Sequence, residues 1–269
     1  MPFVGVQFDT NTMTLEITPE RLTEIKVLLA DWLGRFTCTT RELQQLVGKL
    51  NFVAACVRPA RIFMARLYAL LKGAAQRSSI SLSDDFRKDL VWWATFLDKY
   101  NGVSMMMVEE WGAPDEVLAT DACLVGAGGW CRGEYFHTEF SSDVICRAKH
   151  INGLELLTVI VACKVWRRKL RGKRLVVNCD NQVTVTVINS GRARAPFLQS
   201  CLRELAFVAA TGEFEVRANF IPGIKNHLPD LLSRWGEPDK RAQFRELTQH
   251  IETREVYVYQ GLFDFEHNW

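Results

Sequence analysis

Several common sequence signals are missing from this chain. No apolar run approaches the roughly 20 residues that a transmembrane helix needs, and the N-terminal stretch MPFVGVQFD lacks the basic and apolar regions of a signal peptide. The eight cysteines are scattered singly, without a CxxC pair or a cysteine–histidine cluster at zinc spacing. We therefore expect no membrane partner, and reduced thiols in an intracellular compartment, either cytoplasm or nucleus.

The chain also lacks a strong charge of either sign. Its formal net charge is only +2, so the overall balance does not identify a nucleic-acid binder. Cations are nevertheless concentrated between positions 164 and 174. They fit either a solvated helix end, where cations suit the helix dipole, or a ridge that contacts phosphates. The cations are Lys164, Arg167, Arg168, Lys169, Arg171, Lys173 and Arg174.

What is present suffices for a sizeable core. The chain has 269 residues, of which 48% are hydrophobic and 24% charged, and this suits one large domain or two ordinary ones. Up to about residue 105 the pattern predicts a hairpin over 3–17, with its turn near Thr10 to Thr12, followed by helices. The helix starts rest on local signals, namely Thr18 before Pro19, Thr39 with Glu42, Pro59 ahead of 60–71, and Ser83.

From about residue 115 strands and helices alternate. The predicted order is an antiparallel meander joined to parallel strands by helical crossovers. We therefore predict an α/β fold with a mixed five-stranded sheet flanked by helices and preceded by a mainly helical region. The expected strands are 117–121, 128–133, 134–140, 174–179 and 213–221, and the expected helices are 152–170, 180–188, 195–210 and a last short one at 226–235.

Four carboxylates occupy notable places in this scheme. They are Asp121 at the end of the first strand, Glu155 in the first turn of the next helix, Asp180 directly after a central strand, and Asp230 near the start of the last helix. Neighbouring parallel strands end on one side of a sheet, so Asp121 and Asp180 are expected to emerge together. Like charges this close need a compensating cation, and oxygen ligands suit Mg²⁺. The glycines after Asp121 are expected to let the chain turn and to leave room for a nucleic-acid backbone.

Each carboxylate also has a purely structural interpretation. Asp121 could begin a glycine-rich turn, and Glu155 could complete a capping box with Asn152. Asp180 could cap its own helix, and Asp230 could favour the dipole of a first helical turn. Taken jointly, the four positions favour a metal-binding, catalytic role over these structural ones, because one fold would bring all of them together.

Four stretches together resemble the RNase H domain of a retroelement reverse transcriptase. They are TDACLVGAGGW, INGLELLTVIVACKVW, CDNQVTVTVINSG and FIPGIKNHLPDLLSRW, and they keep the D…E…D…D order of that family. The ending I-P-G-x-x-N-x-x-x-D-x-L-S-R is similar to that of retrotransposon versions of this domain, and the chain most resembles DIRS-like elements, which pair the domain with a tyrosine recombinase. FVGVQFDTNTMTL resembles the stretch after a polymerase site, and RELQQLVGKLNFVAACVRPARIFMARL resembles the thumb and connection. The tail EVYVYQGLFDFEHNW is similar to these elements too, so the resemblance covers nearly the whole chain.

The resemblance implies a domain division and an activity. Residues 1–110 would be the end of the palm, the thumb and the connection, 111–238 the RNase H-like domain, and 239–269 a C-terminal tail. The implied activity is hydrolysis of the RNA strand of an RNA–DNA hybrid by two Mg²⁺ ions, or by Mn²⁺. The implied partners are that hybrid or another nucleic acid, and the rest of a reverse transcriptase.

Residue roles follow from the same resemblance. Asp121, Glu155, Asp180 and Asp230 take the catalytic and metal-binding positions. A basic element beyond the second carboxylate's helix is implied to contact nucleic acid, together with the later loop. The residues concerned are Arg167, Arg168, Lys169, Arg171, Lys173 and Arg174, then Arg192 and Arg194. His227 is the candidate for a histidine that helps the product to leave.

The chain departs from the family in places. It has no Y-x-D-D motif, so polymerisation by this chain alone is not expected, and Asp84 with Asp85 is interpreted as structural. Phe220 replaces the frequent histidine before I-P-G, and Pro229 replaces the frequent alanine before the last carboxylate. A catalytically silent, domesticated nucleic-acid-binding or scaffold protein is therefore the main alternative. A DDE-type transposase or integrase on the same fold is the weaker alternative, because it would place a glutamate last.

Overall fold

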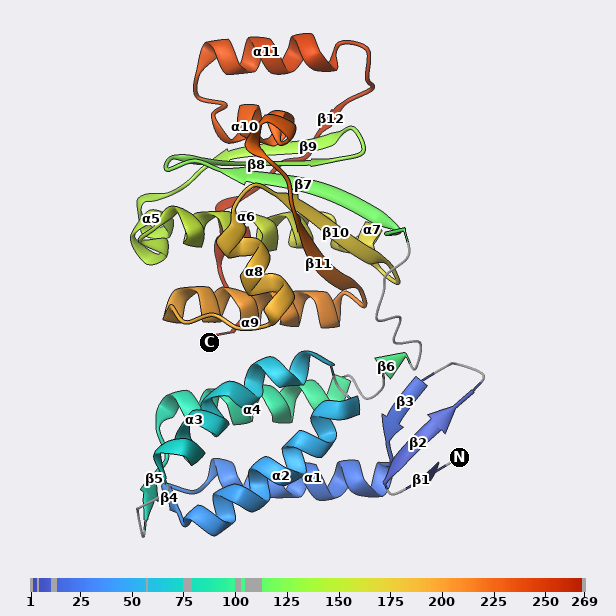
Figure 1. Cartoon of the computed structure of the whole chain (residues 1–269), viewed down its shortest axis with the longest axis vertical. Coiled ribbons are helices and arrows are strands. Elements are labelled where there is room, and N and C mark those ends of the chain that lie inside the picture. The colour runs from blue at the N-terminus through green and yellow to red at the C-terminus, as the bar shows by residue number, and fades with distance from the viewer. Residues whose placement is uncertain are drawn as a thin grey trace. The chain divides into compact units, whose positions relative to one another are not determined.

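Two compact units make up the chain, with the boundary between residues 111 and 112 (Figure 1). The computed structural model describes residues 2–3, 5–10, 14–56, 58–74, 79–99, 103–104 and 113–267. Within these residues, every helix is too short or too polar to cross a lipid bilayer.

The first unit is mainly helical and contains a small antiparallel sheet in the order β1-β2-β3-β6. The paired strands β2 and β3 confirm the predicted hairpin over 3–17, while the predicted turn falls partly outside the described residues. The elements are β1 (Pro2–Phe3), β2 (Val6–Asp9), β3 (Thr14–Ile17), α1 (Pro19–Leu33), β4 (Thr37–Cys38), α2 (Thr40–Cys56), η1 (Arg58–Met64), α3 (Ala65–Gly73), β5 (Ile80–Ser81), α4 (Asp84–Lys99) and β6 (Val103–Ser104).

Local side-chain signals set the starts of three helices in this unit. The Thr18 hydroxyl accepts a backbone N–H from the first turn of α1, whose first residue is Pro19. Thr39 and Glu42 form the expected capping box, with hydrogen bonds of 2.8 and 3.3 Å in the two directions. The Ser83 hydroxyl accepts the N–H of Phe86 in the first turn of α4 at 3.2 Å, which is a single cap. These three predictions are confirmed.

One helix start in the first unit was predicted wrongly. The α-helix expected from about residue 60 is preceded by the 3-10 segment Arg58–Met64, and α3 begins only at Ala65. Pro59 has no N–H with which to continue the α-helical hydrogen bonding of α2. A 3-10 segment is a frequent connector in that situation.

The second unit is built on a mixed sheet in the order β11-β10-β7-β8-β9-β12. Strands β7, β8 and β9 form an antiparallel meander, whereas β10 lies parallel to both β7 and β11. The predicted α/β fold class is therefore confirmed, with six strands instead of five. The strands are β7 (Glu116–Ala122), β8 (Gly126–Cys131), β9 (Glu134–Glu139), β10 (Arg174–Cys179), β11 (Glu215–Phe220) and β12 (Arg254–Glu255).

Helices cover both faces of this sheet (Figure 1). The long helix α6 is buried along most of its length because it lies between the sheet and α9. On the other face, α10 packs against β7 and β8. The helical elements are α5 (Ser142–Ala148), α6 (Ile151–Val165), α7 (Arg167–Leu170), α8 (Gln182–Ser190), α9 (Pro196–Thr211), η2 (Gly223–Lys225), α10 (His227–Ser233), α11 (Pro238–Thr248) and η3 (Gln260–Phe263).

Two expectations for these helices need correction. The single helix predicted over 152–170 is divided, because α6 ends at Val165 and the short α7 follows the buried Trp166. The helix predicted at 226–235 is not the last, since α11 follows it. The polar sequence of α11 buries only Phe244 and Thr248, so it has little of the apolar periodicity from which helices are predicted.

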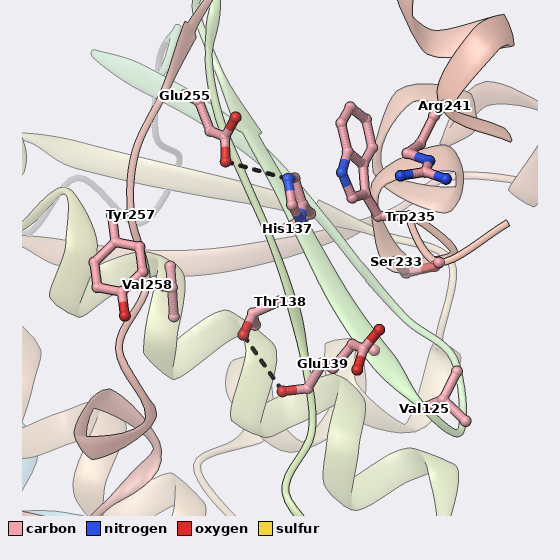
Figure 2. Close-up of a pocket in the computed structure, with 12 residues that line it drawn as sticks. Val125, His137, Thr138, Glu139, Ser233, Trp235, Arg241, Glu255, Tyr257 and Val258 are labelled. Atoms are coloured by element: carbon pink, nitrogen blue, oxygen red, sulfur yellow. Dashed lines mark hydrogen bonds and ion pairs between the residues drawn. The ribbon is translucent and has the colours of Figure 1, made fainter. Parts of the chain in front are cut away.

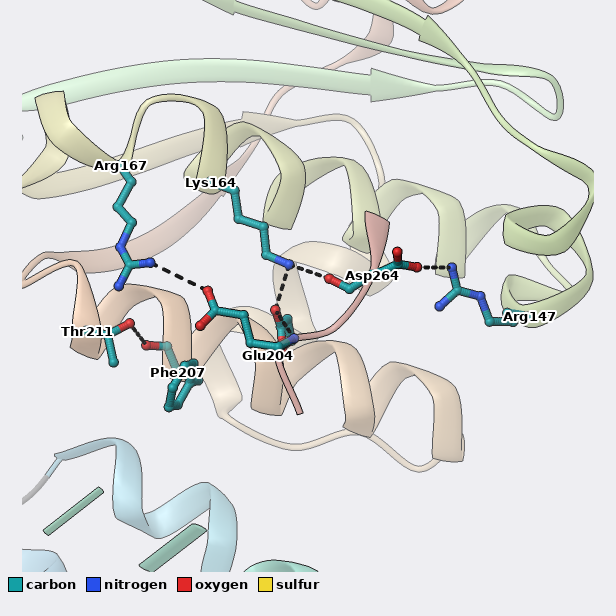
Figure 3. A network of polar contacts seen from close by, with 8 residues as sticks. Arg147, Lys164, Arg167, Glu204, Phe207, Thr211 and Asp264 are labelled. Atoms are coloured by element: carbon teal, nitrogen blue, oxygen red, sulfur yellow. Dashed lines mark hydrogen bonds and ion pairs between the residues drawn. The ribbon is translucent and has the colours of Figure 1, made fainter. Parts of the chain in front are cut away.

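The C-terminal segment 260–267 is held against α6 and α9 by a buried ion pair (Figure 3). Lys164 and Glu204 lie 2.6 Å apart, and the Glu204 side chain is fully buried. Both charged groups also bind the backbone of the segment. The Lys164 ammonium donates to the carbonyl oxygen of Asp264 at 2.6 Å, and the N–H of Glu266 donates to the Glu204 carboxylate at 3.1 Å. With Phe263 fully buried, the segment is an integral part of the second unit.

Candidate active site

Two parallel strands bring Asp121 and Asp180 to the same edge of the sheet. Asp121 lies near the end of β7, and Asp180 directly follows its parallel neighbour β10. Helix α6 contacts β7 and contributes Glu155. Asp121 interacts electrostatically with Asp180 and Asp230, and Glu155 does so with Asp121 and Asp180. The four predicted carboxylates are therefore neighbours in the folded protein.

Two of these carboxylates are buried, which alters their acidity. Asp121 is 5% exposed and Glu155 is 4% exposed. Burial, reinforced by Asp180 and Asp230, raises the pKa of Asp121 to about 6 against the opposing hydrogen bond from Ser233. Burial, with the charges of Asp121 and Asp180, raises the pKa of Glu155 to about 9. A bound cation would lower the pKa of both carboxyl groups again, because it stabilises their ionised forms.

Three of the structural interpretations do not agree with the geometry. Asp121 lies inside β7, paired with Gly128, and does not begin the turn. Glu155 cannot complete a capping box, because α6 begins at Ile151 and Glu155 lies beyond its first turn, among buried residues. The cap of α8 is Asn181, whose side chain accepts the N–H of Thr184 at 2.9 Å, so Asp180 does not cap that helix.

Asp230 does lie in a first helical turn, as its structural interpretation proposed. Its carboxylate accepts a hydrogen bond from Arg234 Nε at 2.9 Å. Pro229 is the third residue of α10. Backbone N–H groups in the first turn make no intrahelical hydrogen bond, so the helix tolerates a proline there. His227 is exposed at the start of the same helix. Helix α10 therefore places the fourth carboxylate and the candidate product-release histidine in one short segment.

The glycines that follow Asp121 have a different role from the expected one. A Cβ atom at Gly128 would lie 2.6 Å from the backbone N of Ser233, and one at Gly126 would lie 2.5 Å from its carbonyl oxygen. Both distances are shorter than real Cβ contacts. These glycines therefore allow α10 to approach β8 closely, and the room they leave is filled by this helix instead of a nucleic-acid backbone.

The donor set fits a hard divalent cation. Carboxylate oxygens are the ligands that Mg²⁺ and Mn²⁺ prefer, and buried carboxylates that share a site require a counter-charge. Among the described residues, the group close enough to surround an ion consists of Glu155, Cys179 and Asp180, with one atom of each within 4.8 Å of the others; Asp121 and Asp230 are not part of it. The Cys179 thiol donates to Glu155 at 3.8 Å, and it was not predicted from the sequence.

Replacing Glu155 with glutamine is expected to stabilise the metal-free protein at alkaline pH. Since the folded pKa is about 9 and the ordinary value is 4.5, the folded state retains a proton that the unfolded chain releases. The resulting stabilisation is complete below about pH 4.5 and is lost as the pH rises towards 9. At pH 8 in EDTA the stabilisation lost by the wild type amounts to roughly 4–5 kcal/mol, so we expect the variant to unfold at a temperature higher by about 10–15 °C. Near pH 4 the two proteins should unfold alike, and equal melting temperatures at pH 8 would contradict the assignment.

Most cations of the basic run are paired with carboxylates of the same chain. The pairs are Lys164–Glu204, Arg167–Glu266, Lys169–Glu134, Arg171–Glu213, Lys173–Glu116 and Arg174–Asp115. Arg168 is exposed, as are Arg192 and Arg194 in the loop between α8 and α9. Across the residues that the structure describes, these three make no ion pair. They are therefore the predicted nucleic-acid contacts most available to phosphates.

A cleft of about 400 Å³ lies between the end of α10, strand β9 and the segment 255–258 (Figure 2). His137 stacks on Trp235 with ring centroids 4.2 Å apart, and His137 Nε2 lies 3.2 Å from the Glu255 carboxylate. Arg241 and the exposed Tyr257 also line the cleft. Ser233 belongs to this lining, and its hydroxyl donates to Asp121, so a single residue connects the cleft and the carboxylates.

Two polar residues of the site were not identified from the sequence as functional. Ser233 donates to Asp121, and Asn226 donates to the backbone oxygen of Thr120 at 2.9 Å. Both belong to the motif-like ending F-I-P-G-I-K-N-H-L-P-D-L-L-S-R-W, so the resemblance marks their positions. Their partners lie more than a hundred positions earlier in the chain, and no local pattern predicts such contacts.

Comparison with known proteins gave no family assignment. No family model matches the sequence, and no curated protein matches it. Two solved structures are similar in part, both of a foamy viral protease-reverse transcriptase, one in complex with an RNA/DNA hybrid and the other with dsDNA. They are 15% and 13% identical to this chain over 81% and 82% of its length, each with a TM-score of 0.32. The chain spans only 29% and 44% of those proteins.

Proposed function

We propose that this chain is an RNase H-type endonuclease that cleaves the RNA strand of RNA–DNA hybrids and belongs to a DIRS-like retroelement reverse transcriptase. The observation that carries the proposal is that Asp121 lies near Glu155, Asp180 and Asp230, with Asp121 and Glu155 buried. Adjacent buried carboxylates cannot all be ionised without a counter-charge, and bound divalent cations would allow them to be ionised together.

In this proposal the four carboxylates hold two Mg²⁺ ions, or Mn²⁺. When bound, such ions supply an activated water and stabilise the leaving 3′ oxygen of the cleaved phosphodiester. The protein keeps the carboxylates in place: the backbone N–H of Ala122 bonds to Glu155, and the Ser233 hydroxyl bonds to Asp121. Burial of these two carboxylates strengthens their attraction for cations, because water screens them less. The proposed activity is hydrolysis alone, since the sequence contains no Y-x-D-D polymerase motif.

The direct test is cleavage of an end-labelled RNA–DNA hybrid in Mg²⁺ or Mn²⁺, with EDTA as the negative control. We expect cuts in the RNA strand of the hybrid, leaving 5′-phosphate and 3′-hydroxyl ends, and no cuts in the same RNA when it is single-stranded or in a DNA duplex of the same sequence. Absence of metal-dependent cleavage would favour the silent binding or scaffold protein instead.

Removing the three unpaired arginines is expected to weaken hybrid binding. Each arginine that neutralises a phosphate adds roughly 1 to the slope of log affinity against log salt concentration, so we expect a slope lower by about 2–3 and, near 0.1 M salt, an affinity reduced about a hundredfold or more. A matched triple variant removes three cations that already have carboxylate partners and should change binding much less. The test variant combines Arg168→Gln, Arg192→Gln and Arg194→Gln, and the control combines Arg171→Gln, Lys173→Gln and Arg174→Gln.

Fluorescence anisotropy of a labelled hybrid at several salt concentrations measures both variants. The net charge changes equally in the two, so a difference between them reports the positions of the cations and not the total charge. An equal decrease of affinity in both variants would contradict the assignment of the three arginines as specific contacts.

A further inference from the structure

Ser233, the last residue of α10, makes a short hydrogen bond to one of the proposed metal ligands. Its hydroxyl donates to Oδ2 of Asp121 at 2.5 Å. Both residues are buried, with Ser233 only 3% exposed. A hydrogen bond from a neutral donor to a carboxylate is stronger and shorter than one between neutral groups, most of all where water is excluded. The bond therefore restrains the rotation of the Asp121 side chain.

The position of Ser233 is itself closely determined. Gly126 and Gly128 of β8 permit the backbone of Ser233 to lie where any larger residue would clash with it. The thiol of Cys123 donates to the Ser233 carbonyl oxygen at 3.2 Å. At the other end of the helix, Asn226 donates to the carbonyl of Thr120, the residue before Asp121. Helix α10 is thus attached to β7 on both sides of Asp230.

The orientation of the hydroxyl group is restricted as well. The Ser233 oxygen lies 3.0 Å from the carbonyl oxygen of Asp230, one helical turn earlier. A serine hydroxyl has a single proton, and an ionised carboxylate accepts it more strongly than a carbonyl does. When Asp121 is ionised, the proton is directed to Oδ2, and Oδ1 remains without this bond.

We propose that Ser233 is a positioning residue of the carboxylate centre, which holds Oδ2 of Asp121 so that Oδ1 is presented to a divalent cation. The proposal rests on the proposed function, because it assigns to Ser233 a role in that same site. Ser233 is also one of the residues that line the cleft beside the end of α10 (Figure 2). Partners that orient metal ligands typically change metal affinity by 10–100-fold when they are removed.

The experiment compares Mg²⁺ binding by the full chain and three variants, using calorimetry and the rise in melting temperature with Mg²⁺. Ser233→Ala is expected to bind Mg²⁺ about tenfold more weakly, and Ser233→Thr, which keeps the hydroxyl, should bind within a few-fold of the wild type. Thr248→Ala is the matched control, because it removes a buried hydroxyl that bonds within α11, and it should leave Mg²⁺ affinity unchanged. The Mg²⁺ concentration for half-maximal hybrid cleavage should shift in parallel.

Should Ser233→Ala fail to fold, Ser233→Cys gives a second test, because it nearly preserves the volume while replacing a strong donor with a weak one. It is also expected to weaken Mg²⁺ binding. Unchanged Mg²⁺ affinity in a folded Ala or Cys variant would overturn the role of Ser233. If the wild type binds Mg²⁺ and cleaves the hybrid, and the folded variants bind and cleave as well as the wild type, only this inference fails. If the wild type neither binds Mg²⁺ nor cleaves, the proposed function fails along with it.

Discussion

Asp121→Asn is expected to reduce cleavage of the RNA strand of an RNA–DNA hybrid by about a thousandfold. Asp121 is the most central of the four carboxylates, since it interacts with Glu155, Asp180 and Asp230. An amide has nearly the same shape but cannot supply a negative charge to a cation. Losing several kcal/mol of metal-dependent stabilisation of the transition state corresponds to roughly three powers of ten in rate. The rate of hybrid cleavage at saturating Mg²⁺ measures the effect.

The same substitution should not harm the fold. The pKa of Asp121 is already raised by burial, so a neutral side chain removes an unfavourable charge from the metal-free protein. We therefore expect an equal or higher melting temperature in EDTA, which separates a catalytic loss from unfolding. Asp115→Asn is the matched control, because Asp115 is exposed and pairs with Arg174 away from the carboxylates. Wild-type cleavage by Asp121→Asn would refute the proposed mechanism.

Glu204→Ala is expected to destabilise the second unit by about 3–5 kcal/mol. The substitution leaves the Lys164 ammonium buried without its partner and removes the acceptor for the N–H of Glu266. Both consequences weaken the attachment of the C-terminal segment to α6 and α9 (Figure 3). Urea-induced unfolding, followed by fluorescence and by circular dichroism, measures the change in the free energy of unfolding.

A double variant distinguishes loss of the pair from loss of volume. Lys164→Met with Glu204→Leu removes both charges and keeps most of the apolar contacts, so it should be markedly more stable than Glu204→Ala alone. An exposed pair supplies the second comparison. Arg171→Ala removes the partner of Glu213, and exposed ion pairs contribute only about 0–1 kcal/mol. If Glu204→Ala lowers the free energy of unfolding no more than Arg171→Ala does, the buried pair is no more important for stability than an exposed one.

Local patterns in the sequence predicted much of this fold. The five longer strands of the second unit alternate or are continuously apolar, and each was expected within a few residues of its observed bounds. The tight turn before β9 was expected as well, and Arg132 and Gly133 there have φ angles of 47° and 85°. The caps at Thr18 and Thr39 follow from side-chain chemistry within three residues, which is why they were predictable.

Features without a local pattern were missed. Strand β12 consists of two exposed residues that pair with β9 more than a hundred positions away, so no alternation marks it. The division of α6 from α7 and the existence of α11 were missed for a similar reason. The basic run is the clearest case. Seven clustered cations fit either a helix end or a phosphate-binding ridge, and the carboxylates that pair with most of them come from distant segments that no local pattern identifies.

The sequence by itself determined which carboxylates are candidates for metal binding and in which order they occur, because residue type and strand pattern are local properties. It also determined the α/β class, through the alternation of apolar residues. Only the tertiary structure decided which cations remain available to phosphates and that Ser233 bonds to Asp121. It also decided that the glycines after Asp121 accommodate α10. The physical reason is that ion pairs, buried hydrogen bonds and close backbone contacts depend on which distant segments meet, and folding alone brings those segments together.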